Sequence, residues 1–238
     1  MGLSIFISLP IVLRRKTSER ATRLINSAAI GILIFLMADV FADVASSLYS
    51  GGSLAGYGAN PTLSAVFAVA LALGFFMLYF FENGSKRSLS PAKTSLMIAI
   101  GIGLQNLTEG LVFGAAAATI GLFSGIALVI LVGFILQNTT EGFPIVAPMV
   151  GRKDERRWVV PALFLLGGIP TLVGGAVGFF YSSTLFNVFF DGLAIGAILY
   201  VIVPMIRHQV REIDNRKQKL VYIGIFLGFL VGFLVNLI

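Results

Sequence analysis

The chain has 238 residues, of which 57% are hydrophobic and only 12% are charged. A typical soluble domain carries about 25% charged residues, so this composition excludes a soluble globular protein and indicates a polytopic membrane protein. The absence of cysteine excludes thiolate metal ligands. The net charge of +6 would point to nucleic acid in a soluble protein, but its distribution along the chain has a different explanation.

Eight apolar segments follow one another and predict an all-α bundle of about eight transmembrane helices in a single domain, residues 1–238. The first segment, residues 1–13, is too short as a helix to cross a hydrocarbon core of about 30 Å. We expect it to be the last part of a span whose start is missing or shortened. The other seven have the length of full spans: residues 24–48, 61–81, 91–118, 122–150, 159–181, 185–206 and 220–238.

The basic residues fall into four clusters, and two apolar spans separate each cluster from the next. The positive-inside rule therefore places all four clusters in the cytoplasm. The basic charge reflects membrane topology, and we expect no nucleic-acid partner. The clusters are Arg14, Arg15, Lys16, Arg20 and Arg23; Lys86, Arg87 and Lys93; Arg152, Lys153, Arg156 and Arg157; and Arg207, Arg211, Arg216, Lys217 and Lys219.

Three aspartates lie within the predicted spans. Asp39 and Asp43 are four residues apart in the span 24–48 and share one helical face. One hypothesis makes them stations on an ion pathway, and another makes one of them a protonated, hydrogen-bonded group inside the bundle. An aspartyl hydrolase is a third hypothesis, disfavoured because both aspartates lie on one helix. Asp191, near the outer end of the span 185–206, is either part of an entrance or a solvated side chain.

One short motif occurs twice inside apolar segments. Residues 105–110 read Gln-Asn-Leu-Thr-Glu-Gly, and residues 137–142, which begin 32 residues later, read Gln-Asn-Thr-Thr-Glu-Gly. Both copies fall near mid-membrane depth on consecutive, hence antiparallel, spans. A charged side chain at this depth costs about 2.5–3.5 kcal/mol on insertion scales. The repeated glutamates, Glu109 and Glu141, therefore predict the functional centre.

Within each copy, the Gln, Asn and Glu side chains share one helical face. Two carboxylates brought together there would repel, and a divalent cation would neutralise both while taking amide oxygens as further ligands. Pro144 removes a backbone donor and leaves the carbonyl of Thr140 available as well. Two other hypotheses remain open: amides that only join helices by hydrogen bonds, and a proton relay without metal.

The two motifs resemble those of the ZIP family of divalent metal transporters, whose fourth and fifth spans carry a His-Asn-x-x-Glu-Gly motif and a related His/Gln-x-x-x-Glu-Gly motif. Residues 13–15 and 196–201 are also similar to the family's first and seventh spans. The resemblance implies an eight-helix bundle, a homodimer and a location in the cell membrane. It further implies a Zn, Fe or Mn ion moved toward the cytoplasm as substrate. The metal ligands it implies are Gln105, Glu109, Gln137 and Glu141, with Asn106 and Asn138 near a second position.

The chain departs from the family pattern at two places. Gln105 stands where family members usually have His, and Ile169 precedes Pro170 where they often have Glu. Imidazole ligands suit Zn, whereas carboxylate and carbonyl oxygens suit Mn. We therefore expect this all-oxygen site to bind zinc less tightly than the sites of histidine-containing relatives. The alternative is a ZIP-like metal sensor or structural membrane protein without transport. We expect no enzymatic activity.

Overall fold

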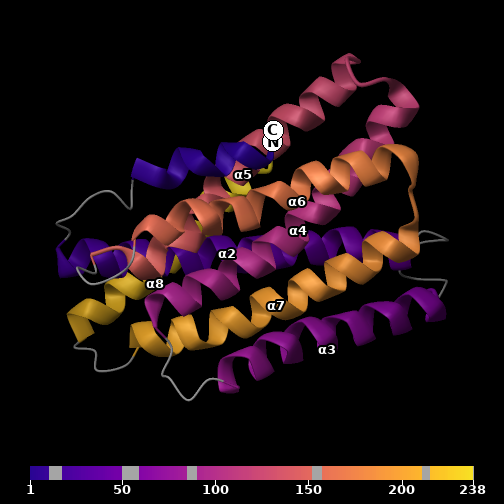
Figure 1. The fold of residues 1–238 in the computed structure, drawn as a ribbon. Helices are drawn as coiled ribbons and strands as arrows, with labels where there is room; N and C mark the ends of the chain where they lie inside the picture. Colours follow the sequence, from indigo (N-terminus) through magenta and orange to yellow (C-terminus); the bar gives the residue numbers. More distant parts are fainter. Residues whose placement is uncertain (11–17, 50–58, 85–89, 152–156, 211–214, 238) are drawn as a thin grey trace.

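The computed structural model describes residues 1–10, 18–49, 59–84, 90–151, 157–210 and 215–237 (Figure 1). Within these residues, the secondary structure is entirely helical, and seven helices are long and apolar enough to cross a membrane. The protein is therefore a multi-pass integral membrane protein that is embedded in a lipid bilayer. The seven helices are α2 (Glu19–Leu48), α3 (Pro61–Asn83), α4 (Pro91–Ile120), α5 (Gly125–Val146), α6 (Val160–Phe180), α7 (Thr184–Val210) and α8 (Asn215–Val235).

The short 3₁₀ helices extend or precede these spans. Helix η1 (Gly2–Ser8) is the first apolar segment, η2 (Ala147–Met149) continues α5, and η3 (Arg157–Val159) leads into α6. Helix η1 covers seven residues of the first apolar segment, and residues 11–13 of that segment lie outside the described residues, so its predicted length stays a prediction. Several members of the basic clusters lie outside the described residues: Arg14, Arg15, Lys16, Lys86, Arg87, Arg152, Lys153, Arg156 and Arg211.

The helices form two groups. Helices α2, α3, α7 and α8 pack together through the α2–α8, α3–α7 and α2–α7 contacts. Helices α4, α5 and α6 form the second group with η1, which lies on α5 and α6. The two groups are joined mainly by the contact between α4 and α7 and also by contacts of α5 with α2 and α8, and Figure 1 shows α4 running through the middle of the bundle.

The backbones of α4 and α6 touch. A Cβ atom on Gly110 would lie 2.3 Å from the carbonyl oxygen of Thr171, and one on Gly174 would lie 2.1 Å from that of Leu107. Small residues allow such close approach between membrane helices, where packing replaces the hydrophobic driving force. Helix α6 is therefore held directly against the motif-bearing face of α4.

The glycines of α8 make a similar contact with α2. A Cβ atom on Gly228 would lie 1.9 Å from the carbonyl oxygen of Ala28, and Gly224 and Gly232 face Ser27 and Phe35 of the same helix. The sequence allowed either packing inside the bundle or a seam between two protomers for these glycines. The first interpretation, which the sequence favoured, is confirmed.

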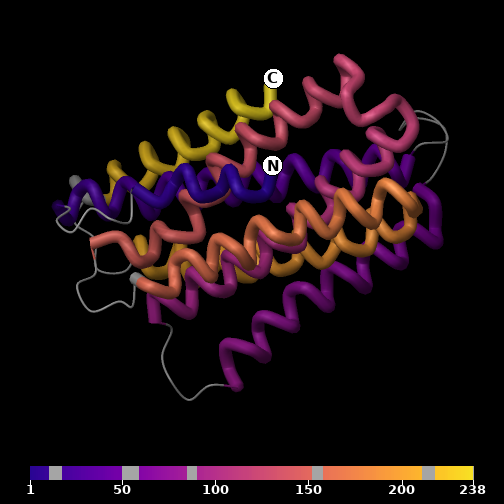
Figure 2. The backbone as a smooth tube through the Cα atoms, turned by 45° about the horizontal axis from the view of Figure 1, so that its top comes forward, coloured from indigo at the N-terminus to yellow at the C-terminus, as the bar shows by residue number. Residues whose placement is uncertain are grey.

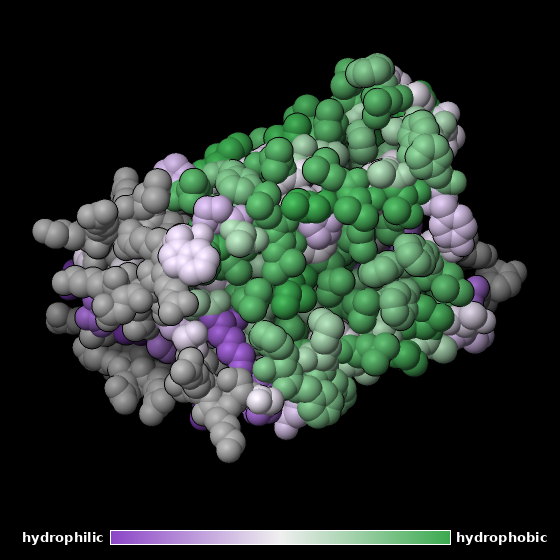
Figure 3. All heavy atoms as spheres, viewed as in Figure 1, coloured by the Kyte–Doolittle hydropathy of each residue, from purple (hydrophilic) through white to green (hydrophobic). Residues whose placement is uncertain are grey.

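The helix ends that adjoin the basic clusters lie together at one end of the bundle, here called the basic end (Figure 2). There, the guanidinium of Arg23 donates to the carbonyl of Gln209 (3.0 Å), and Nζ of Lys93 donates to that of Glu82 (2.8 Å). The hydroxyl of Tyr200 donates to the Glu82 carboxylate. Polar contacts thus join α2 to α7, α3 to α4 and α3 to α7 at this end. Apolar residues cover most of the remaining face in Figure 3.

The first half of α5 packs much less closely than the other spans. Ile126 is 65% exposed and Val129 is 59% exposed. A Cβ atom on Gly133 would meet nothing within 4 Å. Figure 2 shows this half of α5 leaning away from the neighbouring helices. In a bilayer, these side chains face acyl chains.

We predict that Gly228→Ala destabilises the protein, because the added methyl group would overlap the backbone of α2. Overpacking of this kind costs about 1–3 kcal/mol, and thermal unfolding in detergent would measure it. Gly133→Ala is the matched control and should leave the melting temperature unchanged or raise it, since its Cβ has open space. Equal melting temperatures for the two variants would contradict the packing described here.

Candidate functional site

The two motifs meet in the interior of the bundle. Their glutamates are almost completely buried, with Glu109 at 9% and Glu141 at 0% exposure. The four amide side chains around them are buried as well. Together these residues form what we call the amide–carboxylate cluster: Gln105, Asn106, Glu109, Gln137, Asn138 and Glu141.

Glu109 accepts three amide donors. Its Oε1 accepts from Nε2 of Gln105 (2.9 Å) and from Nε2 of Gln137 (2.6 Å), and its Oε2 accepts from Nδ2 of Asn138 (3.3 Å). Two of these donors come from α5 and one from α4. A carboxylate away from water requires such partners, and here they also join the two motifs.

Glu141 is less completely satisfied. Its Oε1 accepts from Nε2 of Gln105 (3.3 Å), so a single amide group bridges the two carboxylates. The side chains of Asn106 and Gln137 also lie within hydrogen-bonding reach of Glu141. Hydrogen bonds therefore join five of the six side chains of the cluster, and the sixth, Asn106, lies among them but donates to α6 instead.

The two asparagines have a second function as anchors. Nδ2 of Asn106 donates to the carbonyl oxygen of Gly167 on α6 (2.9 Å), and Nδ2 of Asn138 donates to that of Phe134 within α5 (2.9 Å). These hydrogen bonds fix the orientation of both amide groups. The hypothesis that amides join helices by hydrogen bonds thus describes part of what Asn106 does.

The cluster has more oxygen atoms than donors to satisfy them. Among the described residues, seven buried side-chain polar atoms have no hydrogen-bond partner. Four of these are oxygens of the cluster: Gln105 Oε1, Asn106 Oδ1, Asn138 Oδ1 and Glu141 Oε2. Buried polar atoms are nearly always paired, so four unpartnered oxygens in one cluster favour a ligand that supplies positive charge or donors.

The glycine that ends each motif allows a neighbouring segment to approach. Gly110 contacts α6, whereas a Cβ on Gly142 would lie 2.4 Å from the carbonyl oxygen of Ile5 in η1. The hydroxyl of Ser8 in η1 also donates to the carbonyl of Thr139 (2.8 Å). Sequence reasoning missed these roles; the one available signal was that Gly directly follows Glu in both copies.

The three aspartates of the predicted pathway lie on the other helix group, Asp39 and Asp43 on α2 and Asp191 on α7. Asp43 is exposed and Asp39 is partly buried, whereas Asp191 is buried. Asp39 also accepts a hydrogen bond from Nδ2 of Asn236 (2.6 Å). Both span-two aspartates lie on one helix, α2, which continues to disfavour an aspartyl hydrolase.

Asp191 is not solvated. Its side chain is only 7% exposed, so that alternative for this residue is wrong. The side chain of Thr108, a motif position to which the sequence assigned no role, lies within hydrogen-bonding reach of Asp191. Thr108 therefore connects the first motif to the acidic residue of α7.

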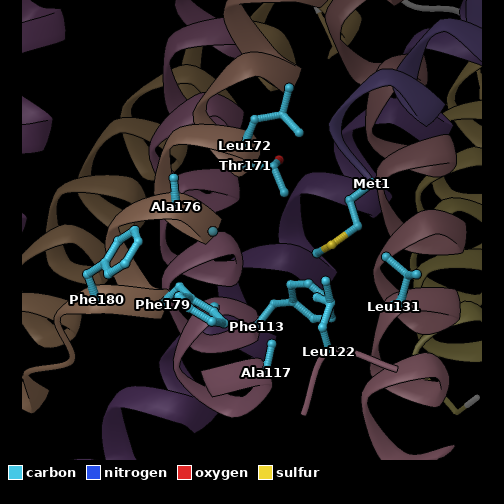
Figure 4. Close-up of a pocket in the computed structure, with 12 residues that line it drawn as sticks. Met1, Phe113, Ala117, Leu122, Leu131, Thr171, Leu172, Ala176, Phe179 and Phe180 are labelled. Carbon is cyan, nitrogen blue, oxygen red and sulfur yellow. The ribbon is translucent and has the colours of Figure 1, made fainter. Parts of the chain in front are cut away.

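An apolar pocket of about 370 Å³ lies beside the cluster, between the outer parts of α4 and α6 (Figure 4). Phe113, Leu131, Leu172 and Phe179 are among its lining residues, and Met1 closes one side. None of the six cluster residues lines this pocket. Its lining is mainly apolar, and Thr171 contributes a hydroxyl group.

Within the described part of the chain, no three His, Cys, Asp or Glu side chains are grouped as a metal site. The cluster supplies two carboxylates, and a cation bound there would take its remaining ligands from amide oxygens. The chain matches no protein-family model and no curated protein. The functional assignment therefore depends on the chemistry of these residues.

We predict that Glu109→Gln lowers stability more than Glu141→Gln. Both oxygens of Glu109 accept N–H donors, so the new NH₂ at position 109 would face at least one donor in either orientation, whereas at position 141 it could take the place of Oε2, which accepts none. Each buried donor left unsatisfied costs about 1–3 kcal/mol. Thermal unfolding in detergent without added metal measures the difference, and equal shifts for the two variants would contradict the hydrogen-bond pattern.

Proposed function

We propose that the protein is a ZIP-like transporter that moves divalent metal cations toward the cytoplasm through the amide–carboxylate cluster. The observation that carries this proposal is the set of unpartnered buried oxygens beside two buried carboxylates. A hard divalent cation takes six or more oxygen ligands from carboxylates, amides and water. The cluster offers such a donor set in the middle of a membrane bundle.

Glu109 and Glu141 would carry the charge of the site, and Gln105 and Gln137 would add amide oxygens. The amide nitrogens of Asn106 and Asn138 donate to backbone carbonyls. The two amide oxygens take no part in these hydrogen bonds and remain available as ligands. They would complete this site or hold a second ion next to it. A proton could also relieve the repulsion between two carboxylates, but it would leave the amide oxygens without partners.

The two helix groups suggest how an ion could pass. The cluster lies on α4 and α5, whereas Asp39 and Asp191 lie on α2 and α7 of the other group. A movement of one group against the other would transfer an ion between the aspartates and the cluster. The ZIP resemblance implies such alternating access, and the close glycine contacts within each group would keep each group rigid during the movement.

The ZIP resemblance implies the direction of transport, and the proposed topology says which end of the bundle is cytoplasmic. Positive-inside placement of the four basic clusters puts the basic end in the cytoplasm, and the aspartates then lie toward the outer half of the bundle. The resemblance also implies a homodimer in the cell membrane. The alternative function, a metal sensor or structural membrane protein, would retain the cluster without moving ions.

We predict that proteoliposomes containing the full chain take up Mn²⁺ and Fe²⁺, with Zn²⁺ less preferred than in histidine-containing relatives because the ligands are all oxygen. Parallel assays with Mn²⁺, Fe²⁺, Co²⁺ and Zn²⁺ would establish the order. Glu141→Gln should abolish uptake, since it removes one of the two charges while leaving most of the hydrogen bonds to Glu109 in place.

The matched control is Glu19→Gln, which removes a carboxylate at the start of α2, outside the cluster. It should leave uptake unchanged. Metal binding without uptake of any ion by folded wild-type protein would favour the sensor. If folded wild-type protein neither binds nor takes up any of these ions, the proposed function is overturned.

A further inference from the structure

The four amides of the cluster fall into two kinds. The nitrogens of Asn106 and Asn138 donate to backbone carbonyls, which fixes those amide groups. The nitrogens of Gln105 and Gln137 donate to carboxylates, and in the described part of the chain no backbone carbonyl accepts from them. The last side-chain torsion of glutamine is broad and roughly two-fold, so these two amides can rotate within their sites.

The N–H groups of the two glutamines lie where a cation between the carboxylates would lie. Nε2 of Gln105 is 2.9 Å from Glu109 and 3.3 Å from Glu141. Nε2 of Gln137 is 2.6 Å from Glu109. Each N–H presents a partial positive charge to the carboxylates and so weakens the repulsion between them. A metal ion cannot share that position, because amide N–H groups donate and only the amide oxygen is a ligand.

We propose that Gln105 and Gln137 form a rotating amide switch, an inference that rests on the proposed function. In one orientation, the N–H group of Gln105 bridges Glu109 and Glu141, and that of Gln137 donates to Glu109. When a divalent cation enters between the carboxylates, both amides turn by about half a rotation and present their oxygens as ligands. The unpartnered Oε1 of Gln105 is then the atom that the cation satisfies.

The switch distinguishes this cluster chemically from one built with histidine. An imidazole ligand must be neutral, so a metal ion competes with a proton for it near pH 6.5. A glutamine amide does not titrate. In the metal-free protein its N–H groups, rather than a bound proton, weaken the repulsion between the carboxylates. At positions 105 and 137, metal binding therefore replaces N–H hydrogen bonds to the carboxylates by contacts from the amide oxygens. No proton is released from these two side chains when the metal binds.

The test uses Mn²⁺ and the full chain in detergent. Binding is followed by electron paramagnetic resonance, and the glutamine side-chain carbonyls carry a ¹³C label for infrared difference spectra. Wild-type protein should show a shift of the labelled carbonyl band when Mn²⁺ is added. Gln105→Met, which keeps the length of the side chain and removes its oxygen, should weaken Mn²⁺ binding about 10–100-fold and reduce the band shift. Gln137→Met provides a second, independent variant with the same expectation.

Gln209→Met is the matched control, because Gln209 is a buried glutamine of α7 outside the cluster. It should change neither the affinity nor the band shift. Mn²⁺ binding that disappears in Glu141→Gln but persists unchanged in Gln105→Met and Gln137→Met would overturn the switch while leaving the proposed function standing. Absence of Mn²⁺ binding to wild-type protein would overturn both.

Discussion

Two buried carboxylates must be accommodated inside an apolar bundle, and much of the interior is arranged around this requirement. Glu109 is satisfied by three amide donors from two helices, and Glu141 shares one of those donors. Each donor is placed by the register of the helix that carries it. A buried charge without such partners would shift the balance against folding by several kcal/mol.

The register is in turn held by backbone contact. Gly110 and Gly174 let α4 and α6 approach until Asn106 can reach the carbonyl of Gly167. Gly142 does the same for η1, whose Ser8 donates to α5. The glutamate and the glycine of each motif thus form one unit: the glycine brings in the neighbouring backbone, and that backbone holds the helix segment on which the glutamate lies. A bulkier residue at either glycine would displace the carboxylate beside it.

Much of this arrangement could be predicted from the sequence. Apolar length alone predicted the seven spans, and the spacing within each motif placed Gln, Asn and Glu on one face. The sequence also predicted that Glu109 and Glu141 would meet, because consecutive spans are antiparallel. These are properties of one helix or of two neighbouring helices, which composition and periodicity describe well.

Contacts between distant segments could not be predicted in this way. The approach of η1 to α5 and the link from Thr108 to Asp191 depend on how the whole bundle closes, and no local pattern encodes that. Asp191 was placed near an outer boundary by its position in the segment, yet the packing of α7 buries it. The direction of each amide group was also beyond the sequence, since glutamine offers a donor and an acceptor on the same face.

The loosely packed first half of α5 has a consequence for the membrane around the protein. Ile126 and Val129 point away from the other helices, so acyl chains rather than protein support this half of the helix. Gln137, Asn138 and Glu141 lie further along the same helix. The thickness and lateral pressure of the bilayer therefore act on the tilt of α5, and through that tilt on the spacing between the two carboxylates. Lipid composition is in this sense a component of the site.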